Sequence, residues 1–305
     1  NSWIGMAGPA MIEGGGLGKF DPKEIGPSDI QKNNGVIDYV AEDEKEATII
    51  AKKILSYFQG DIKDWKADDQ TQLSNIMPKD RRWSYPVRDI IRIISDIEQF
   101  TEIRPDYGKG IVSCFIRIEG KPFGLLANDS QHLGGAIDSE GADKASSFIE
   151  ICSEYGLPII SLVDTPGFMV GPDSEKEGAV RRMSNLFKIG SKVKVPLTAI
   201  FLRKGYGLGA QAMVGGSLHE PVYTAAWPTG EFGAMGLEGA VKLGFKKELE
   251  KIEDNSKREE LFNSLVEKLY DKGKAIEAAA HLEIDAVINP SETRSVILKS
   301  QKAFV

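Results

Sequence analysis

The chain has 305 residues, 41% of them hydrophobic, which is enough to bury one large core or two smaller ones. Its net charge of −7 argues against nucleic-acid binding, and no apolar run approaches the roughly 18 residues that would span a membrane. Cys114 and Cys152 are too few for a disulfide framework or a four-cysteine zinc site.

The first 60 residues combine an irregular start with one helix. Residues 1–35 are interrupted by Gly-Pro pairs and a run of three glycines, which is typical of irregular structure. Residues 36–40 have the composition of a short strand, and from Asp43 apolar residues recur at helical spacing as far as Phe58. The chain starts without Met and without a secretory signal, so we expect a truncated or processed chain. The two cysteines favour a cytoplasmic location, or the mitochondrial matrix in a eukaryote.

Residues 61–84 are predicted to be a linker, because they are polar and broken by a proline. They end in a charged run in which Arg81 and Arg82 could bind a phosphate, although a solvated charge cluster is the arrangement we expect. A new unit starts at Pro86, a residue suited to a first helical turn, and an apolar helical face follows as far as Ile97.

The middle of the chain predicts a hairpin and then a longer helix. Residues 111–118 and 122–127 are apolar runs on either side of a short turn signal. A glycine-rich loop at 133–136 precedes a predicted helix over 142–155, which ends before a glycine. Cys152 lies on the apolar face of this helix and is expected to be a core residue, not a nucleophile.

Two buried strands, each followed by a glycine-containing loop and a helix, come next. Residues 158–163 lead into the loop 164–171, and a helix is predicted from Ser174 to Lys192. Residues 195–202 then lead into the glycine-rich turn 203–210. Repeated strand-loop-helix units imply parallel pairing, so we expect both loops at the carboxyl edge of one sheet.

The turn at 203–210 is the strongest candidate for a reactive centre. The amides that open a helix have no partner within it and can donate to developing negative charge, so this turn predicts an oxyanion hole made of backbone amides. The alternative is that the glycines serve only the shape of a tight turn. Gly205, Gly207 and Gly209 are too closely spaced for a dinucleotide-binding fingerprint.

The remaining features favour structural roles. Residues 246–274 predict a solvated outer helix broken near 254–256, with partner binding as the alternative, and a last helix begins at Pro290. None of the three histidines, His132, His219 and His281, has cysteine or carboxylate partners at metal-ligand spacing, so no metal site is expected.

Four motifs in order now suggest a family. They are DTPGFMVG at 164–171, RKGYG at 203–207, AWP through MG at 226–236, and NPSETR at 289–294. Together they resemble the carboxyltransferase (beta) subunit of biotin-dependent acyl-CoA carboxylases, as in propionyl-CoA carboxylase. The match runs from about residue 86 to the end, and the glycine-rich start resembles the end of the amino-terminal half of the same subunits.

The resemblance implies an α/β fold of the crotonase type, a spiral of β/α units, with two such domains in tandem in each subunit. Residues 1–60 would then be the end of the amino-terminal, acyl-CoA-binding domain, 61–84 a linker, and 85–305 the carboxyl-terminal, biotin-side domain. Most of the acyl-CoA half would be missing from this chain.

The implied activity is transfer of the carboxyl group from carboxybiotin to the α carbon of a short-chain acyl-CoA, with propionyl-CoA or acetyl-CoA as acceptor. The biotin nitrogen can take the α proton, so the protein has to supply mainly amide donors to two oxyanions. The resemblance places the biotin-side hole at Gly207, Leu208 and Gly209. Relatives have a small residue where this chain has Leu208, whose bulk would narrow the pocket. It also implies that Gln211 bears on acyl-chain choice, and that cofactor contacts come from Gly167, Phe168, Met169 and Tyr206, with a core role open for Phe168 and Met169.

The resemblance also implies partners: a biotin carboxylase, a biotin carboxyl carrier, the amino-terminal half of the subunit, and further copies of the chain. Three alternatives remain. A decarboxylase subunit of the glutaconyl-CoA type would run the transfer in reverse. A crotonase-like hydratase or isomerase would need positioned acids, and Glu231 and Glu238, the only acids near the second motif, have no evident pairing. The chain could also be a non-catalytic assembly or biotin-binding module.

Overall fold

The computed structural model describes residues 2–302, which form an eight-stranded sheet with helices on both faces. The strands are β1 (Phe100–Ile103), β2 (Ile111–Ile118), β3 (Lys121–Asn128), β4 (Ile159–Thr165), β5 (Leu197–Tyr206), β6 (Tyr223–Ala226), β7 (Glu231–Gly233) and β8 (Ala286–Val287). The α-helices are α1 (Pro9–Gly14), α2 (Ser28–Gln31), α3 (Glu44–Ser56), α4 (Val87–Ile94), α5 (Ser139–Glu154), α6 (Pro172–Lys176), α7 (Ala179–Gly190), α8 (Gly207–Met213), α9 (Leu237–Gly244), α10 (Lys246–Glu250), α11 (Asn255–Gly273), α12 (Ala275–Ala280) and α13 (Thr293–Lys302). Four short 3-10 helices are η1 (Pro22–Glu24), η2 (Gln70–Asn75), η3 (Leu133–Gly135) and η4 (Pro290–Glu292).

The sheet changes from antiparallel to parallel at β3. Its strand order is β1-β2-β3-β4-β5-β6-β8, and β7 pairs with the end of β5. The predicted hairpin is confirmed as β2 and β3, which pair antiparallel around a turn whose residues Glu119 and Gly120 both have positive φ. The predicted parallel pairing of β4 with β5 is also confirmed.

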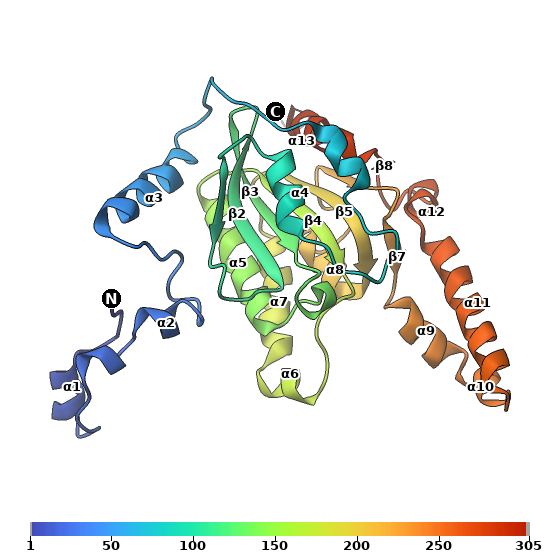
Figure 1. The fold of residues 1–305 in the computed structure, drawn as a ribbon, viewed down its shortest axis with the longest axis horizontal. Coiled ribbons are helices and arrows are strands. Elements are labelled where there is room, and N and C mark those ends of the chain that lie inside the picture. Colours follow the sequence, from blue (N-terminus) through green and yellow to red (C-terminus); the bar gives the residue numbers. More distant parts are fainter. Residues whose placement is uncertain (1, 303–305) are drawn as a thin grey trace.

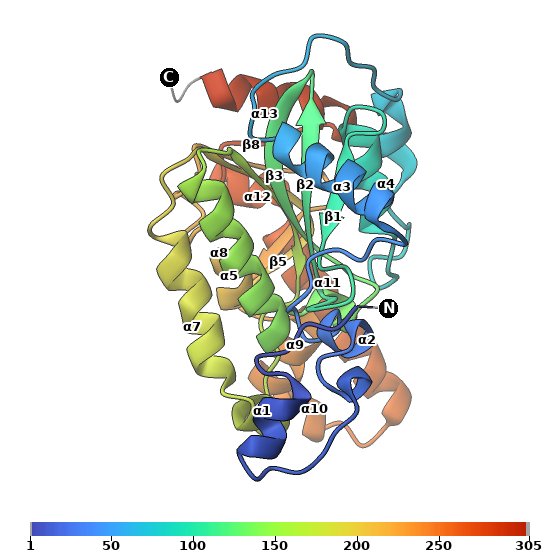
Figure 2. The ribbon, with the colours of Figure 1, turned by 90° about the vertical axis from the view of Figure 1, so that its left-hand side faces the viewer.

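Two hydrophobic cores lie on the two faces of the sheet. One contains residues of α5, α7 and α8, and the other contains residues of α4, η2 and α13. Figure 2 shows α5 and α7 on one side of the strands and α4 on the other. Because both faces are covered, β2 and β4 are buried at every position, which explains why both strands are mainly apolar in sequence.

The strands that lead to the predicted site are longer than the sequence suggested. The first extends to Thr165 and the second to Tyr206, and α8 begins at Gly207. The predicted turn over 203–210 is therefore wrong in its bounds. Pairing of Lys204, Gly205 and Tyr206 with β7 carries β5 beyond its apolar run, which a pattern of apolar residues alone could not indicate.

Three other local predictions need correction. Residues 36–40 form no strand, and Asp38 instead accepts a backbone hydrogen bond from Arg104 through its carbonyl. The predicted helix from Ser174 to Lys192 is two helices, separated at Gly178, whose φ of 71° is left-handed. The helix at Pro86 ends at Ile94, so Ile97 lies outside it and is exposed.

The segment predicted as a linker packs onto the second core. Leu73 in η2 is fully buried, and η2 contacts η4 near the carboxyl end of the chain. Before it, Tyr57 at the end of α3 is also fully buried and belongs to the first core. The domain boundaries at residues 60 and 84 remain a prediction.

Helices at both ends of the chain project from the sheet. Figure 1 shows α1 and α2 in blue on one side and α9, α10 and α11 in orange on the other. The predicted break near 254–256 is confirmed, since α10 ends at Glu250 and α11 begins at Asn255, capped by the Asp254 side chain. The last predicted helix is confirmed as η4 followed by α13. Within residues 2–302, none of the helices combines the length and apolar character needed to cross a membrane.

Candidate functional site

The carboxyl ends of β4 and β5 lie side by side, as predicted. Thr165 pairs with Gly205, so the loop after β4 and the start of α8 meet at one edge of the sheet. A Cβ atom added to Gly209 would lie 2.7 Å from the Cα of Gly167 and 2.9 Å from the amide nitrogen of Phe168. Glycine at position 209 is therefore required by this close backbone approach, whatever else it does.

Helix α8 starts at the centre of the predicted site. Gly207 has a φ of +58°, and a Cβ there would lie 2.8 Å from the carbonyl oxygen of Ala234. Since the helix begins at Gly207, the amides of Leu208 and Gly209 belong to its first turn and have no acceptor within it. Leu208 is 63% exposed, whereas Gly209 is buried against the loop after β4.

A cavity of about 470 Å³ lies next to the β5–α8 junction. Gly207 and Gln211, two of the predicted site residues, line it together with Phe232 of β7. The rest of its wall includes Lys272, Gly273, Glu277, His281 and Glu283. These residues come from the region of α11 and α12, far along the chain, and no motif in the sequence marked them.

The other predicted contacts lie away from this cavity. Phe168 and Met169 are partly buried and pack against the first core, where the ring of Phe168 lies 6.2 Å from that of Phe187. Met169 donates a backbone hydrogen bond of 2.8 Å to the carbonyl oxygen of Ile137. Tyr206 is only 2% exposed, and its hydroxyl lies next to the Glu231 carboxylate. The structure thus brings Gly167 and Gly209 together, and Gly207 and Gln211 together, but buries the larger side chains.

A buried ion pair fixes the sheet edge under the site. Arg203 Nη2 lies 2.9 Å from Asp164 Oδ2, and both side chains are at most 3% exposed. The amide of Lys204 donates to the other carboxylate oxygen of Asp164 at 3.0 Å. Arg203 also donates to the carbonyl oxygens of Arg81 and Trp83, at 2.8 and 2.6 Å. These bonds attach the end of the predicted linker to β4 and β5.

Arg81 does not belong to the solvated charge cluster that we expected from the sequence. Its Nη2 atom donates to Glu238 Oε1 at 2.6 Å, and its Nη1 atom lies 3.6 Å from Glu231 Oε1. Both acids that lacked an evident pairing in the sequence therefore share this arginine. Burial raises the pKa of Glu231, whereas the charge of Arg81 acts in the opposite direction. Only Arg82 is solvated, where it pairs with Asp80.

Metal-binding residues do not gather in the described part of the chain, where no group of three His, Cys, Asp or Glu side chains could hold an ion. His281 lies on the cavity wall, and its Nδ1 atom is 2.8 Å from the carbonyl oxygen of Glu277. Cys114 and Cys152 are both free and buried. The chemistry available at the cavity is therefore that of backbone amides, apolar surface and a rim of charged side chains.

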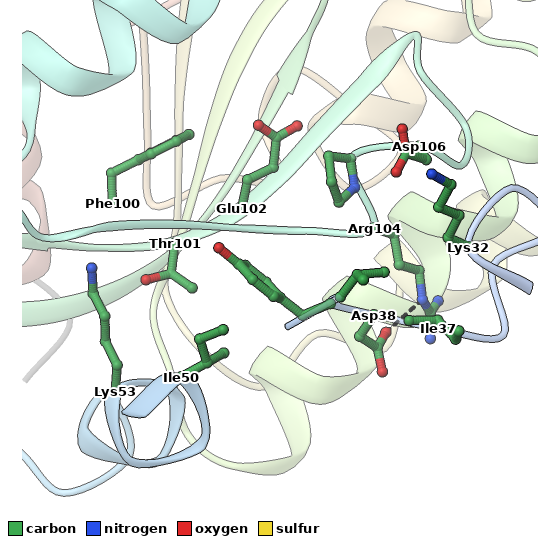
Figure 3. A pocket seen from close by; sticks show the side chains of 13 residues that line it. Lys32, Ile37, Asp38, Ile50, Lys53, Phe100, Thr101, Glu102, Arg104 and Asp106 are labelled. Atoms are coloured by element: carbon green, nitrogen blue, oxygen red, sulfur yellow. Dashed lines mark ion pairs between the residues drawn. The ribbon is translucent and has the colours of Figure 1, made fainter. Parts of the chain in front are cut away.

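A second cavity, of about 530 Å³, lies between the start of the chain and β1 (Figure 3). Several of its charged groups have partners: Arg104 pairs with Asp38 across one wall, and Glu102 pairs with Arg88 of α4. Lys53 donates to the carbonyl oxygen of Glu98 at 2.8 Å. None of the predicted site residues lines this cavity, whose wall also includes Lys32 and Asp106.

Comparison with known proteins gives a consistent result. The family model "Carboxyl transferase domain" matches residues 1–305. The methylmalonyl-CoA carboxyltransferase 12S subunit of Propionibacterium freudenreichii subsp. shermanii is 32% identical over 89% of this chain and 53% of its own length. The methylmalonyl-CoA decarboxylase subunit alpha of Veillonella parvula is 28% identical over 97% of this chain and 58% of its own.

Solved structures agree with these relatives. A single-chain, multi-domain long-chain acyl-CoA carboxylase is 52% identical and matches 97% of this chain and 30% of its own, with a TM-score of 0.90. The transcarboxylase 12S hexamer with bound methylmalonyl-CoA is 29% identical over 98% of this chain and 59% of its own, with a TM-score of 0.85. The predicted crotonase-like α/β fold is thereby confirmed. The chain spans about half the length of the curated relatives it matches. It belongs to the carboxyl transferase domain family.

Proposed function

We propose that this chain is the biotin-side part of the carboxyltransferase component of a biotin-dependent acyl-CoA carboxylase. It would move the carboxyl group of carboxybiotin to the α carbon of a short-chain acyl-CoA, with propionyl-CoA or acetyl-CoA as acceptor. The observation that carries the proposal is the start of α8, where Leu208 is exposed and Gly209 packs against the loop after β4, in a chain of this family.

The residues present fit a bound biotin group. First-turn amides of α8 are suitable donors for an oxygen that gains negative charge, and Leu208 in this turn is exposed, whereas Gly209 is buried. The neighbouring cavity adds apolar surface from Phe232 and Ala210. Biotin, when carboxylated on its carrier, supplies the activated carboxyl group. The chain's own contribution is the two amide donors of Leu208 and Gly209. Gln211, in the same helix, is the residue proposed to influence which acyl chain is accepted.

The proposal includes partners that lie outside this chain. They are a biotin carboxylase, a biotin carboxyl carrier, the acyl-CoA half of the subunit, and further copies of the chain. We also propose residues 1–60 as the end of that acyl-CoA half, 85–305 as the biotin-side domain, and the cytoplasm as the location. The relatives' names, which include carboxyltransferase and propionyl-CoA carboxylase subunits, support this reading.

The decisive experiment measures transfer of labelled carboxyl from a carboxylated biotin carrier to acetyl-, propionyl-, butyryl- and 3-methylcrotonyl-CoA, with the upstream half restored. Label in one product would establish the reaction and name the acceptor. A folded protein that binds the carrier but labels none of the four would overturn the proposal.

The amide assignment has its own test in Leu208→Pro, with Leu208→Ala as the matched control. Proline is tolerated in the first turn of a helix, so Leu208→Pro removes one amide donor from an exposed position and leaves the fold intact. Loss of one such donor is worth about a hundredfold to a thousandfold in kcat. Leu208→Ala keeps the amide and should retain most activity. Equal rates for the two variants would contradict the assignment.

A decarboxylase subunit is the second candidate, because one relative, 28% identical over 97% of this chain, is named as the alpha subunit of a methylmalonyl-CoA decarboxylase. The same amides would serve either direction of transfer. Transfer of the labelled carboxyl group from a malonyl-type thioester to a biotin carrier would favour this candidate if no transfer from carboxybiotin to an acyl-CoA is seen.

A further inference from the structure

A group of polar side chains, two of them buried and two partly exposed, lies behind the β5–α8 junction. It consists of Arg81, Tyr206, Glu231 and Glu238, and is called the Arg81 cluster below. Successive side chains of a strand point to opposite faces, so Glu231 faces away from the cavity that its neighbour Phe232 lines. The cluster is therefore not part of the cavity wall, and nothing in the proposed chemistry uses it directly.

Arg81 joins three separate elements through its side chain. Its guanidinium lies 3.6 Å from Glu231 on β7 and 2.6 Å from Glu238 on α9. It also lies over the ring of Tyr270 on α11, 5.5 Å from the ring centre. Its own backbone is fixed, because its carbonyl oxygen accepts from Arg203, the partner of Asp164. One side chain thus links the sheet edge to the projecting helices α9 and α11.

The cluster reaches the helix start through Tyr206, the residue before Gly207. Tyr206 pairs with Gly233 of β7, and a Cβ on Gly233 would lie 3.5 Å from the Tyr206 ring. Within the described residues, neither the Tyr206 hydroxyl nor either Glu231 oxygen has a close hydrogen-bond partner. A carboxylate that is 1% exposed is costly unless a charge compensates it, and Arg81 is the cation beside it.

We propose that Arg81 is a positioning residue for the amide site. Through Glu231 and Tyr206 it holds the β5–α8 junction in place, and through Glu238 and Tyr270 it couples that junction to α9 and α11. The catalytic consequence rests on the proposed function, whereas the coupling itself does not.

The test compares Arg81→Ala, Arg81→Lys and the neighbouring Arg82→Ala, each in the chain with its upstream half restored. Amide hydrogen exchange is followed by mass spectrometry in peptides covering 204–213 and 231–244, with β2 and β3 as the internal reference. We expect Arg81→Ala to speed exchange about tenfold in both peptides and to leave the reference unchanged. Arg81→Lys should restore part of the protection, and Arg82→Ala should match the parent because the Arg82 side chain is exposed and its ion pair is with the neighbouring Asp80.

Kinetics provide the second measurement. A shift of the helix start by about 1 Å costs about a hundredfold in rate, so kcat should fall in Arg81→Ala while the KM for acyl-CoA stays near that of the parent. Loss of protection spread evenly over the molecule, or no change in the two peptides, would overturn the proposal. If Arg81→Ala does not fold, Arg81→Lys is compared with Arg82→Lys, and the exchange rates of the two peptides and the kcat values are judged in the same way. If the parent transfers no carboxyl group, the proposed function fails, but the exchange comparison still decides this inference.

Discussion

At the scale of single residues, the close approach of Gly209 to Gly167 constrains the site. A Cβ at position 209 would lie 2.7 to 2.9 Å from three backbone atoms of Gly167 and Phe168, and backbone cannot move aside as a flexible side chain can. The start of α8 and the loop after β4 can therefore pack this closely only because residue 209 has no Cβ atom.

We therefore expect Gly209→Ala to destabilise the fold by about 1–3 kcal/mol and to reduce carboxyl transfer, because the two backbones must separate. Denaturant unfolding and the transfer assay measure both effects. Gly244→Ala is the control, since a Cβ there meets nothing within 4 Å. A Gly209→Ala variant that matches this control would show that the two backbones are not in close contact.

Lys144 is a second unusual residue, on α5 and 1% exposed. Its Nζ atom has no hydrogen-bond partner within residues 2–302. Burial lowers its pKa to about 8, and the nearby Glu102 offsets only part of that effect. The unfolded state, with a lysine pKa near 10.4, then binds more protons between about pH 8 and pH 10. Stability should accordingly rise with pH over that interval.

Lys144→Met should remove this rise and stabilise the protein at pH 7, by up to about 3 kcal/mol, because no charge is then buried. Urea unfolding at pH 7, 8.5 and 10 measures the free energy of unfolding of each protein. The control is Lys188→Met, at an exposed position of α7, whose unfolding free energy should change with pH as that of the parent does. If the unfolding free energy of Lys144→Met rises with pH as steeply as that of the parent, Lys144 is hydrated in the folded protein.

At the scale of elements, Arg294 links α13 to the end of α4 and to the β2–β3 turn, while Ser300 and Gln301 of the same helix hydrogen-bond to Thr198 of β5. Arg294 Nη1 donates to the carbonyl oxygen of Ile94 at 2.9 Å, and its Nη2 atom donates to the fully buried Asp96. The ring of Trp65 lies 5.1 Å from its guanidinium carbon. Asp96 also accepts from the amides of the β2–β3 turn, so the last helix, α4 and the hairpin meet at one carboxylate.

We expect Arg294→Ala to cost about 3–5 kcal/mol of unfolding free energy, because it leaves Asp96 buried without its cation. The matched control is Arg92→Ala, whose ion pair with Asp89 is half exposed, and which should change stability by less than about 1 kcal/mol. Chemical denaturation gives both values. Restoring stability by adding Asp96→Asn to Arg294→Ala would support the unpaired charge as the cause.

At the scale of the whole molecule, the Asp164–Arg203 pair holds three regions together. It joins the ends of β4 and β5, and through Arg203 it fixes the carbonyl oxygens of Arg81 and Trp83. The segment before α4 is thereby tied to the sheet edge that carries the site. Loss of this pair should affect stability and the site together.

Asp164→Asn removes the negative charge and keeps the side-chain volume. We expect it to destabilise the fold by about 3–5 kcal/mol, since Arg203 is then buried without its partner. Asp173→Asn, in an exposed ion pair with Lys176, should be close to neutral. Thermal unfolding of the two variants provides the comparison, and similar transition temperatures would contradict a central role for the pair.

Local patterns in the sequence predicted most of the elements. The helix from Asp43, the hairpin, the helix that became α5 and the two parallel strands all follow from apolar spacing and glycine or proline signals. The strand at 36–40 was wrong because short apolar runs also occur in exposed segments. The bounds of β5 were wrong because its apolar run ends at Leu202, whereas Lys204, Gly205 and Tyr206 extend the strand by pairing with β7.

The sequence by itself determined the family, the alternation of strand, loop and helix, and the meeting of the loops after β4 and β5, because parallel pairing depends on local apolar patterns. Only the tertiary structure decided which side chains reach the cavity. It showed Gln211 beside Phe232 and Lys272, Tyr206 turned inward, and Arg81 paired with Glu231 and Glu238. The hydrogen bond from Arg81 to Glu238, for example, joins residues 157 positions apart. Charge pairing over such separations depends on where the folded backbone places each residue, and no local pattern encodes it.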